Sequence, residues 1–284
     1  MTLLEKRMRG LNRDLLTAVS KVLGHAKPKG VHRLRTTIRR IESLVSYANP
    51  DLGKKEQRTL EKMADLRKRA GKVRDFDVQT DILETLGNGS ATKEREALAE
   101  LLQKKREQRA QRLESGLKKL HGAKFLSRLD QIAELAGVLQ DGKNSASAPL
   151  EKAKALLVEM ADNFGSSETI KPSRLHEARV ALKHIRYTAE LAEDSAEQKA
   201  FMRELKSVQN AIGDWHDWLE LTERAEKRFS DRANSPLLRE ARTVLSARHS
   251  DAISSVKKLF SKAQAPAKKP SRSDRSLPTA ARSA

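Results

Sequence analysis

Cysteine is absent from this 284-residue sequence, so disulfides, thiolate catalysis and cysteine-ligated metal sites are excluded. No apolar run approaches the roughly 18 residues that a membrane-spanning helix needs, and the amphipathic N-terminus lacks the apolar core of a signal peptide. Aromatic residues make up only 4%, too few for the base-stacking surfaces typical of single-stranded nucleic-acid binders. Together these absences favour a cytoplasmic protein without membrane contact.

Positive charge is abundant. The sequence has 57 lysines and arginines against 38 aspartates and glutamates, which gives a formal net charge of +19 and predicts an acidic partner. Hydrophobic residues make up 38% and recur with helical periodicity, so the chain can bury a core and is not simply a disordered polycation. No segment alternates polar and apolar residues for long enough to form a strand. The sequence therefore predicts an all-α fold, as one large domain or as two of about 140 residues.

One stretch, VHRLRTTIRRIESLV at residues 31–45, returns in altered form as LHEARVALKHIRYTA at residues 175–189. At about 100° per residue, each copy places its apolar residues on one helix face and its cations along an adjacent face. The apolar faces comprise Leu34, Ile38, Ile41, Leu44 and Val45 in the first copy, and Ala178, Ala181, Leu182, Ile185 and Ala189 in the second. The cations form a first basic ridge of His32, Arg35 and Arg39 and a second basic ridge of His176, Arg179, Lys183 and Arg186.

A basic ridge on a helix is usually a solvated face. Like charges one turn apart, however, repel each other by a few tenths of a kcal/mol per pair. Here the cations recur at the same phase in both copies, with no acid interleaved to relieve them. We therefore expect a bound anion to supply the missing negative charge.

A second element is repeated, as LRKRAGKVRDFDV at residues 66–78 and as VQNAIGDWHDWLE at residues 208–220. The two copies match Gly71 to Gly213, Arg74 to His216, Asp75 to Asp217 and Phe76 to Trp218. Arg67 and Arg74 fall on the same helix face as apolar residues and should point inward. We expect the acids Asp75, Asp77 and Asp217 to hold inward arginines or histidines rather than to act in catalysis, and we expect Trp215 and Trp218 to belong to the core.

Periodicity and turn signals predict further helices at about 2–23, 54–86, 92–120, 123–139, 150–163, 197–230 and 236–260, with a turn at 88–90. The helix at 92–120 is rich in cations, and most of them should be solvated. Arg109 is the exception, because it falls among leucines and should face inward. Arg248 should face inward as well, among Leu245, Ala241 and Ala252.

The pattern HxxRxxx[RK] occurs once as His32, Arg35 and Arg39 and again as His176, Arg179 and Lys183. In this paired occurrence the sequence resembles the CHAD domains, a family of histidine-bearing α-helical domains whose members bind inorganic polyphosphate. The second repeated element carries the same resemblance, with a glycine followed by R-D-x-D-V in one half and by H-D in the other. The resemblance covers about residues 1–262.

The resemblance implies two antiparallel four-helix bundles, related by a pseudo-two-fold axis, whose basic ridges face a central groove or pore. The halves would span residues 1–140 and 150–263, with a linker at 141–149 and a disordered basic tail at 264–284. Two departures from the family pattern make the groove asymmetric. Ala178 stands where the family often has leucine, and Glu42 stands where the matching residue of the second half is Arg186.

The ligand implied by the resemblance is inorganic polyphosphate, with a possible association with polyphosphate granules. We expect no cofactor, no metal and no catalysis, and we favour a monomer. The residues expected to bind polyphosphate are His32, Arg35, Arg39, Arg40, Arg67, Arg74, Arg109, His176, Arg179, Lys183, Arg186, His216 and Arg248.

Two other functions remain open from the sequence. Nucleic acid could satisfy the same basic surface, because counter-ion release serves any polyanion, but no zinc finger, RRM signature or obvious helix-turn-helix is present. An enzyme is the third possibility. It is disfavoured because the sequence has no GxxxxGK[ST] phosphate loop and no ExExK signature of a triphosphatase, and because the arginines beside His32 and His176 would repel a metal ion.

Overall fold

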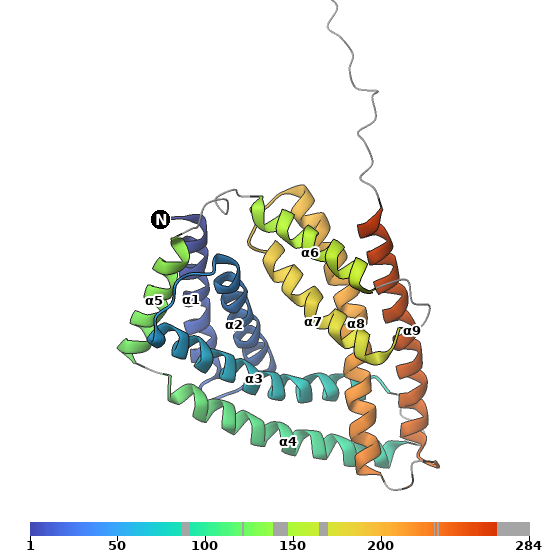
Figure 1. Ribbon diagram of the computed structural model, residues 1–284. Coiled ribbons are helices and arrows are strands. Elements are labelled where there is room, and N and C mark those ends of the chain that lie inside the picture. The colour runs from blue at the N-terminus through green and yellow to red at the C-terminus, as the bar shows by residue number, and fades with distance from the viewer. Residues whose placement is uncertain are drawn as a thin grey trace, which may run out of the picture.

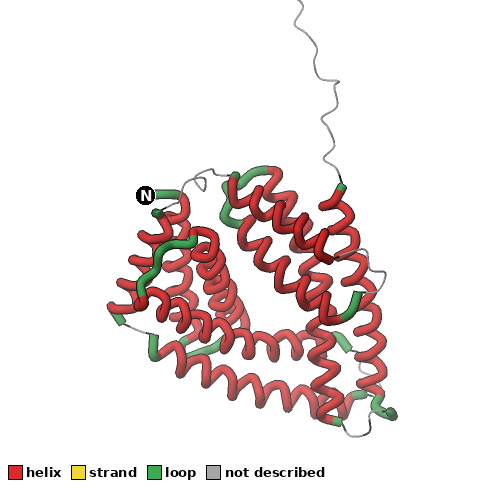
Figure 2. The backbone as a smooth tube through the Cα atoms, viewed as in Figure 1, coloured by secondary structure: helices red, strands yellow, loops and turns green. Residues whose placement is uncertain are grey.

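The structure is a computed structural model that describes residues 1–86, 91–120, 122–138, 147–164, 170–229, 231 and 233–265. Within these residues the chain forms nine helices and no strand, which confirms the all-α prediction (Figure 2). The helices are α1 (Leu3–Val22), α2 (Pro28–Ala48), α3 (Lys54–Leu83), α4 (Thr92–Lys118), α5 (Ala123–Gly137), α6 (Ala148–Phe164), α7 (Pro172–Ala189), α8 (Ala196–Arg228) and α9 (Pro236–Gln264).

The two copies of the first repeat begin in the same way. Pro28 opens α2 and Pro172 opens α7, each after a lysine in extended conformation. Proline suits this position because the first helical residue has no intrahelical partner for an N–H group. The ends differ: α2 stops at Asn49 in the left-handed conformation, with φ 47°, whereas α7 runs into a turn at Glu190. Each ridge therefore begins at the same depth in its helix.

Three buried apolar clusters hold the helices together. The first joins α1, α2 and α5 to the start of α3 and the end of α4. The second joins α6 and α7 to the start of α8 and the end of α9. The third combines the remaining halves of the four long helices α3, α4, α8 and α9. Helices of 27 to 33 residues make this possible, because at about 1.5 Å per residue they reach beyond one bundle into the next.

Figure 1 shows the arrangement that results. Helices α1, α2 and α5 stand on one side and α6 and α7 on the other, while α3 and α4 run along the base to meet α8 and α9. The two sides also touch directly, through α2 against α7 and α3 against α8. Trp215 belongs to the second cluster and Trp218 to the third, so both are core residues as predicted.

Some predicted features lie outside the described residues: the turn at 88–90, most of the linker at 141–149 and nearly all of the tail at 264–284. At their edges, α6 begins at Ala148 and α9 continues to Gln264. No helix in the described ranges has the length and the apolar character needed to cross a membrane.

Candidate functional site

The two basic ridges have matching exposure on α2 and α7. His32 and His176 are exposed, whereas Arg35, Arg39, Arg179 and Lys183 are partly buried. The opposite faces of both helices enter the apolar clusters, where Leu34 and Ile38 of α2 and Leu182 of α7 are fully buried. The separation of a basic face from an apolar one, predicted from the periodicity, is therefore confirmed. It leaves the polar ends of the ridge side chains free to meet other groups.

The ridges meet at a pocket of about 410 Å³ where α2 and α7 approach each other. Arg39, Glu42 and Arg67 line the pocket from the first half of the chain. Arg179 and Lys183 line it from the second half. Four cations thus surround one cavity against a single carboxylate, which is a composition suited to an anion.

Burial and mutual repulsion change the protonation of these cations. Burial, followed by the positive charges of Arg179 and Arg39, lowers the pKa of Lys183 to about 6. Burial and the charge of Arg39 lower the pKa of Arg35 to about 10. His32, although partly open to solvent, also has a lowered pKa, because of partial burial first and of the charge of Arg74 next. The ligand-free site therefore holds more positive charge than its own acids neutralise.

Carboxylates from α3 and α8 lie behind the ridges. Arg179 is 4.0 Å from Asp217, and burial raises the pKa of that carboxyl to about 6 despite the nearby arginine. Burial likewise raises the pKa of Asp75, opposed by the charges of Arg35 and Arg179. Of the acids predicted to hold inward cations, Asp217 thus pairs with Arg179, whereas Asp75 acts on Arg35 and Arg179 through its charge.

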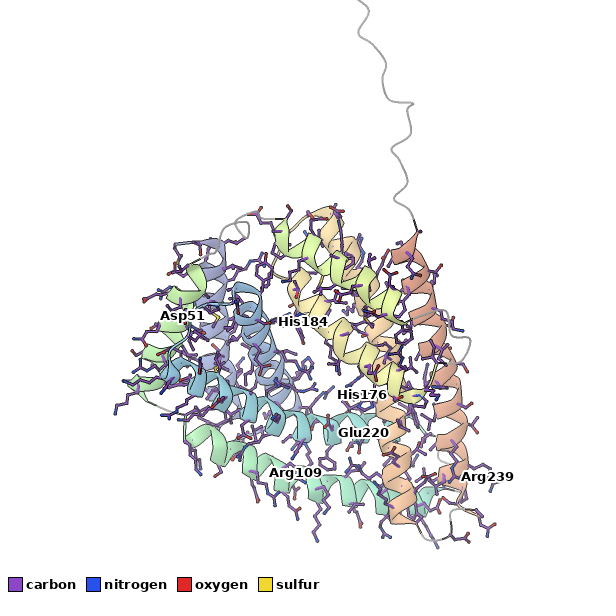
Figure 3. All side chains as sticks on the ribbon, in the orientation of Figure 1. Asp51, Arg109, His176, His184, Glu220 and Arg239 are labelled. Carbon is purple, nitrogen blue, oxygen red and sulfur yellow. The ribbon has the colours of Figure 1, made fainter. Side chains whose placement is uncertain are left out.

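His216 of α8 extends the second ridge toward α3. Its ring centroid is 5.6 Å from that of His176, and its Nε2 is 3.3 Å from Glu220. Burial, followed by the charge of Arg179, lowers the pKa of His216 to about 4. Glu220 in turn accepts a hydrogen bond of 3.1 Å from Gln79 of α3. Figure 3 places His176 and Glu220 near the crossing of α3 with α8.

Several other cations expected at the site are engaged with acids. Arg67 pairs with Glu42 at 2.7 Å and Arg74 with Asp81 at 3.9 Å. Arg67 nevertheless lines the pocket between the ridges, and Arg74 acts on His32. Both therefore remain close to the candidate site, with part of their charge neutralised.

Arg40 and Arg186 share one acid from opposite halves of the chain. Arg40 is 2.8 Å from Glu190 and Arg186 is 2.9 Å from the same carboxylate. Arg186 also lies 4.5 Å above the ring of Tyr187. Arg40 and Glu190 line a second pocket of about 450 Å³ that contains two further acids, Asp14 and Asp194. This second pocket is poorly suited to an anion, because its three carboxylates outnumber its two arginines, Arg7 and Arg40.

The prediction that Arg248 faces inward is wrong. Its side chain is 46% exposed and lies 3.6 Å from Asp251 on the surface of α9. The next residue, His249, turns inward instead, with its ring centroid 5.7 Å from that of Trp215 and its Nε2 buried. One residue corresponds to about 100° around a helix, so a small error in the assumed phase exchanged the two positions.

On α4, Arg106 binds both α3 and the connection between α1 and α2. Its Nε donates to the carboxylate of Asp77 at 2.5 Å, and its Nη2 donates to the carbonyl of Ala26 at 2.7 Å. The Asp77 side chain is only 1% exposed, so this pair is structural. Arg109 is partly buried, and Figure 3 shows it along α4, away from the labelled site residues.

Sequence reasoning missed two groups that organise the meeting of the halves. Arg7 of α1 donates hydrogen bonds to the carbonyls of Glu190 and Ala192, and the bond to Ala192 measures 2.6 Å. Arg224 of α8 lies 4.6 Å above the ring of Phe76 on α3. Neither residue belongs to a repeated pattern, so the sequence offered no signal for them.

Comparisons with known proteins show the family to which this fold belongs. Residues 7–226 match the model of a family described as the CHAD domain. The chain belongs to the CHAD domain family. The family is known for binding polyphosphate. A search of curated proteins finds no match.

Solved CHAD-type structures show the same fold. The protein resembles the crystal structure of the CHAD domain from the plant Ricinus communis, with a TM-score of 0.67 at 17% identity over 93% of this chain and 91% of that one. It also resembles PptA from Streptomyces chartreusis, with a TM-score of 0.57 at 16% identity over 92% of this chain and 97% of that one. In the described part of this CHAD domain, no group of three or more histidine and carboxylate side chains is placed to hold a metal ion.

Proposed function

We propose that this CHAD domain binds inorganic polyphosphate in a groove between its two basic ridges, without catalysing a reaction. The observation that carries the proposal is the convergence of Arg39, Arg179 and Lys183 on one pocket from two distant parts of the chain. Burial, followed by the charges of Arg179 and Arg39, lowers the pKa of Lys183, and a polyanion bound beside these arginines would relieve their repulsion.

Polyphosphate suits the site better than nucleic acid does. It carries about one negative charge per phosphate and no bases, so its receptor needs cations but no stacking surfaces. The two tryptophans of this chain are buried in apolar clusters and are not available for stacking. Duplex DNA is therefore the competitor in the test below.

Within the proposed groove, all the ridge residues of α2 and α7 except Arg186 contact the phosphates directly. These residues are His32, Arg35, Arg39, His176, Arg179 and Lys183. Arg67, Arg74 and His216 extend the groove at its sides. Arg40 and Arg186 contribute less, because their shared carboxylate, Glu190, neutralises part of their charge. Arg109 and Arg248 act at most through long-range charge. The halves at 1–140 and 150–263 would form two bundles about a pseudo-two-fold axis, the monomer would be the binding unit, and polyphosphate granules would be its cellular partner.

The test is binding of polyphosphates of graded length at fixed salt. Affinity should rise with length until the chain fills the groove and then level off, because further phosphates find no additional ridge. Long polyphosphate should displace duplex DNA from the protein, whereas equal affinity for both would favour a general polyanion binder. Phosphate release from triphosphate in the presence of a divalent metal would contradict the non-catalytic role.

A further inference from the structure

Lys183 is the only primary amine in the two basic ridges. It lines the pocket of about 410 Å³ together with Arg39, Arg67 and Arg179. In the described ranges, no carboxylate lies within ion-pair distance of its Nζ. The acid that acts on it, Asp217, already faces Arg179 at 4.0 Å. The amine is therefore held among arginines without an acid of its own.

Charged groups from three helices surround this amine. From α2 these are Arg35 and Arg39, from α7 Arg179, and from α8 Asp217 and His216. Glu42, Arg67 of α3 and His184 are further charged or titratable residues in the lining of the pocket. Because the amine is buried, and because the arginines around it outweigh the acids, its pKa falls to about 6. At neutral pH Lys183 is therefore uncharged in most molecules, and its Nζ carries a lone pair.

We infer that Lys183 is a site of covalent acylation by small acyl phosphates, whose phosphate end is bound by the arginines of the same pocket. An acyl phosphate joins a dianionic phosphate to an electrophilic carbonyl carbon, so an anion bound beside Arg39 and Arg179 presents that carbon to Nζ. This juxtaposition of a phosphate-binding surface and an unpaired amine does not require an enzyme.

The chemical step is balanced. The Nζ lone pair attacks the carbonyl carbon, the bond between that carbon and the bridging oxygen breaks, and inorganic phosphate leaves with the electron pair. The nitrogen then loses one proton to water. The product is a neutral amide at Lys183. It removes an amine that a bound polyanion could protonate, and it fills part of the pocket volume. The consequence for polyphosphate rests on the proposed function, whereas the acylation itself does not.

The first experiment is labelling with acetyl phosphate, followed by mass spectrometry of each lysine. Lys206, which is exposed on α8, serves as the internal reference. At pH 7 Lys183 should be acetylated about tenfold faster than Lys206. From pH 7 to pH 9 its rate should change less than twofold, whereas an ordinary lysine gains about tenfold per unit as its neutral fraction grows. A Lys183 rate that rises like that of Lys206 and does not exceed it would overturn the inference.

The second experiment separates amine reactivity from phosphate recognition. Acetic anhydride carries no charge, so inorganic phosphate should slow the labelling of Lys183 by acetyl phosphate severalfold and leave its labelling by the anhydride unchanged. If phosphate has no effect on either reagent, the arginines do not bind the acyl phosphate and the inference fails. Lys183→Arg should abolish the label at this site, and the matched variant Lys206→Arg should leave it intact.

Polyphosphate binding distinguishes the two proposals. The acetylated protein, and the neutral variant Lys183→Gln, should bind long polyphosphate about tenfold more weakly than the unmodified protein does. If the unmodified protein fails to bind polyphosphate, the proposed function is wrong and the labelling result stands by itself. If it binds while Lys183 is labelled no faster than Lys206, the acylation inference alone is wrong.

Discussion

The helices α2 and α7 carry the same pattern of cations with the same exposure but differ in how their charge responds to pH. On α2, Arg35 has a pKa of about 10 and stays protonated at neutral pH. On α7, Lys183 has a pKa of about 6, and His216 beside it has a pKa of about 4. Arginine resists deprotonation far better than lysine when both are buried among cations. At the matching arginine and lysine positions, the repeated sequence has thus produced a first ridge whose Arg35 keeps its charge at neutral pH and a second ridge whose Lys183 titrates.

The two ridges also differ in the acids that accompany them. Glu42 of α2 neutralises Arg67, whereas the matching residue of α7, Arg186, adds a cation. Arg186 is itself held by Glu190, which it shares with Arg40. The charge difference expected from Glu42 is therefore partly offset, because Glu190 neutralises part of the charge of Arg186, a pairing that the sequence did not reveal. The first ridge offers stable charge and the second offers charge that a ligand can induce.

The largest effect should come from removing the fixed charge of α2. Arg35→Gln combined with Arg39→Gln should weaken binding of long polyphosphate by about 100-fold, because two charge-assisted contacts of about 1.5 kcal/mol each are lost. Short oligomers should lose less, since the second ridge still accepts them. Binding isotherms at fixed salt measure both. The control pair Arg58→Gln and Arg239→Gln, at exposed positions, should change affinity less than about threefold. Equal losses in the two pairs would mean that only net charge matters.

The next effect concerns the stability of the ligand-free protein. The pKa of Lys183 is lower in the folded chain than its ordinary value of 10.5, so the unfolded chain binds more protons between pH 6 and pH 10.5 and stability should rise with pH across that window. Lys183→Met should remove this cost and raise the free energy of unfolding at pH 7 by about 2 kcal/mol, or Tm by about 5 °C. Thermal unfolding from pH 6 to pH 9 measures it, with Lys206→Met as the control. An unchanged or lower Tm in Lys183→Met would show that burying Lys183 among arginines does not destabilise the ligand-free protein.

The pH dependence of binding gives a third test of the difference between the ridges. Bound polyphosphate should raise the pKa of Lys183, so binding takes up a proton and affinity increases as pH falls from 8 toward 6, by up to about tenfold per unit. The slope of log affinity against pH gives the number of protons taken up on binding. Lys183→Arg, which keeps a fixed charge, should lower that number by up to one. Titrations with long chains avoid the protons of terminal phosphates. Identical slopes in the two proteins would assign the proton uptake to the histidines instead.

The smallest effect should come from making the ridges more alike. Glu42→Gln frees Arg67, which lines the pocket, and should tighten polyphosphate binding by about threefold to fivefold. The same change at an exposed acid of α4, Glu100→Gln, should leave affinity nearly unchanged. Competition binding at fixed ionic strength can resolve the difference. A similar gain in both variants would reduce the role of Glu42 to its contribution to net charge.

Much of the fold could be predicted from the sequence, because a helix and its apolar face depend on residues that are close together along the chain. The repeated apolar faces and the buried tryptophans both follow from spacing along one helix. The failed prediction has a physical cause. Arg248 was placed inward and turned out to be exposed, because on a long helix with few apolar residues the phase of the buried face is poorly fixed.

The sequence by itself determined the helices, the two ridges and their separation from the apolar faces, since these depend on residues three and four positions apart. Tertiary structure alone decided which cations share a cavity and which are neutralised. Arg40 and Arg186 meet at Glu190, Arg106 pairs with Asp77, and Lys183 loses its proton beside Arg39. Such outcomes depend on burial and on charges brought together from distant segments, because electrostatic energy follows distance in space and local dielectric rather than order along the chain.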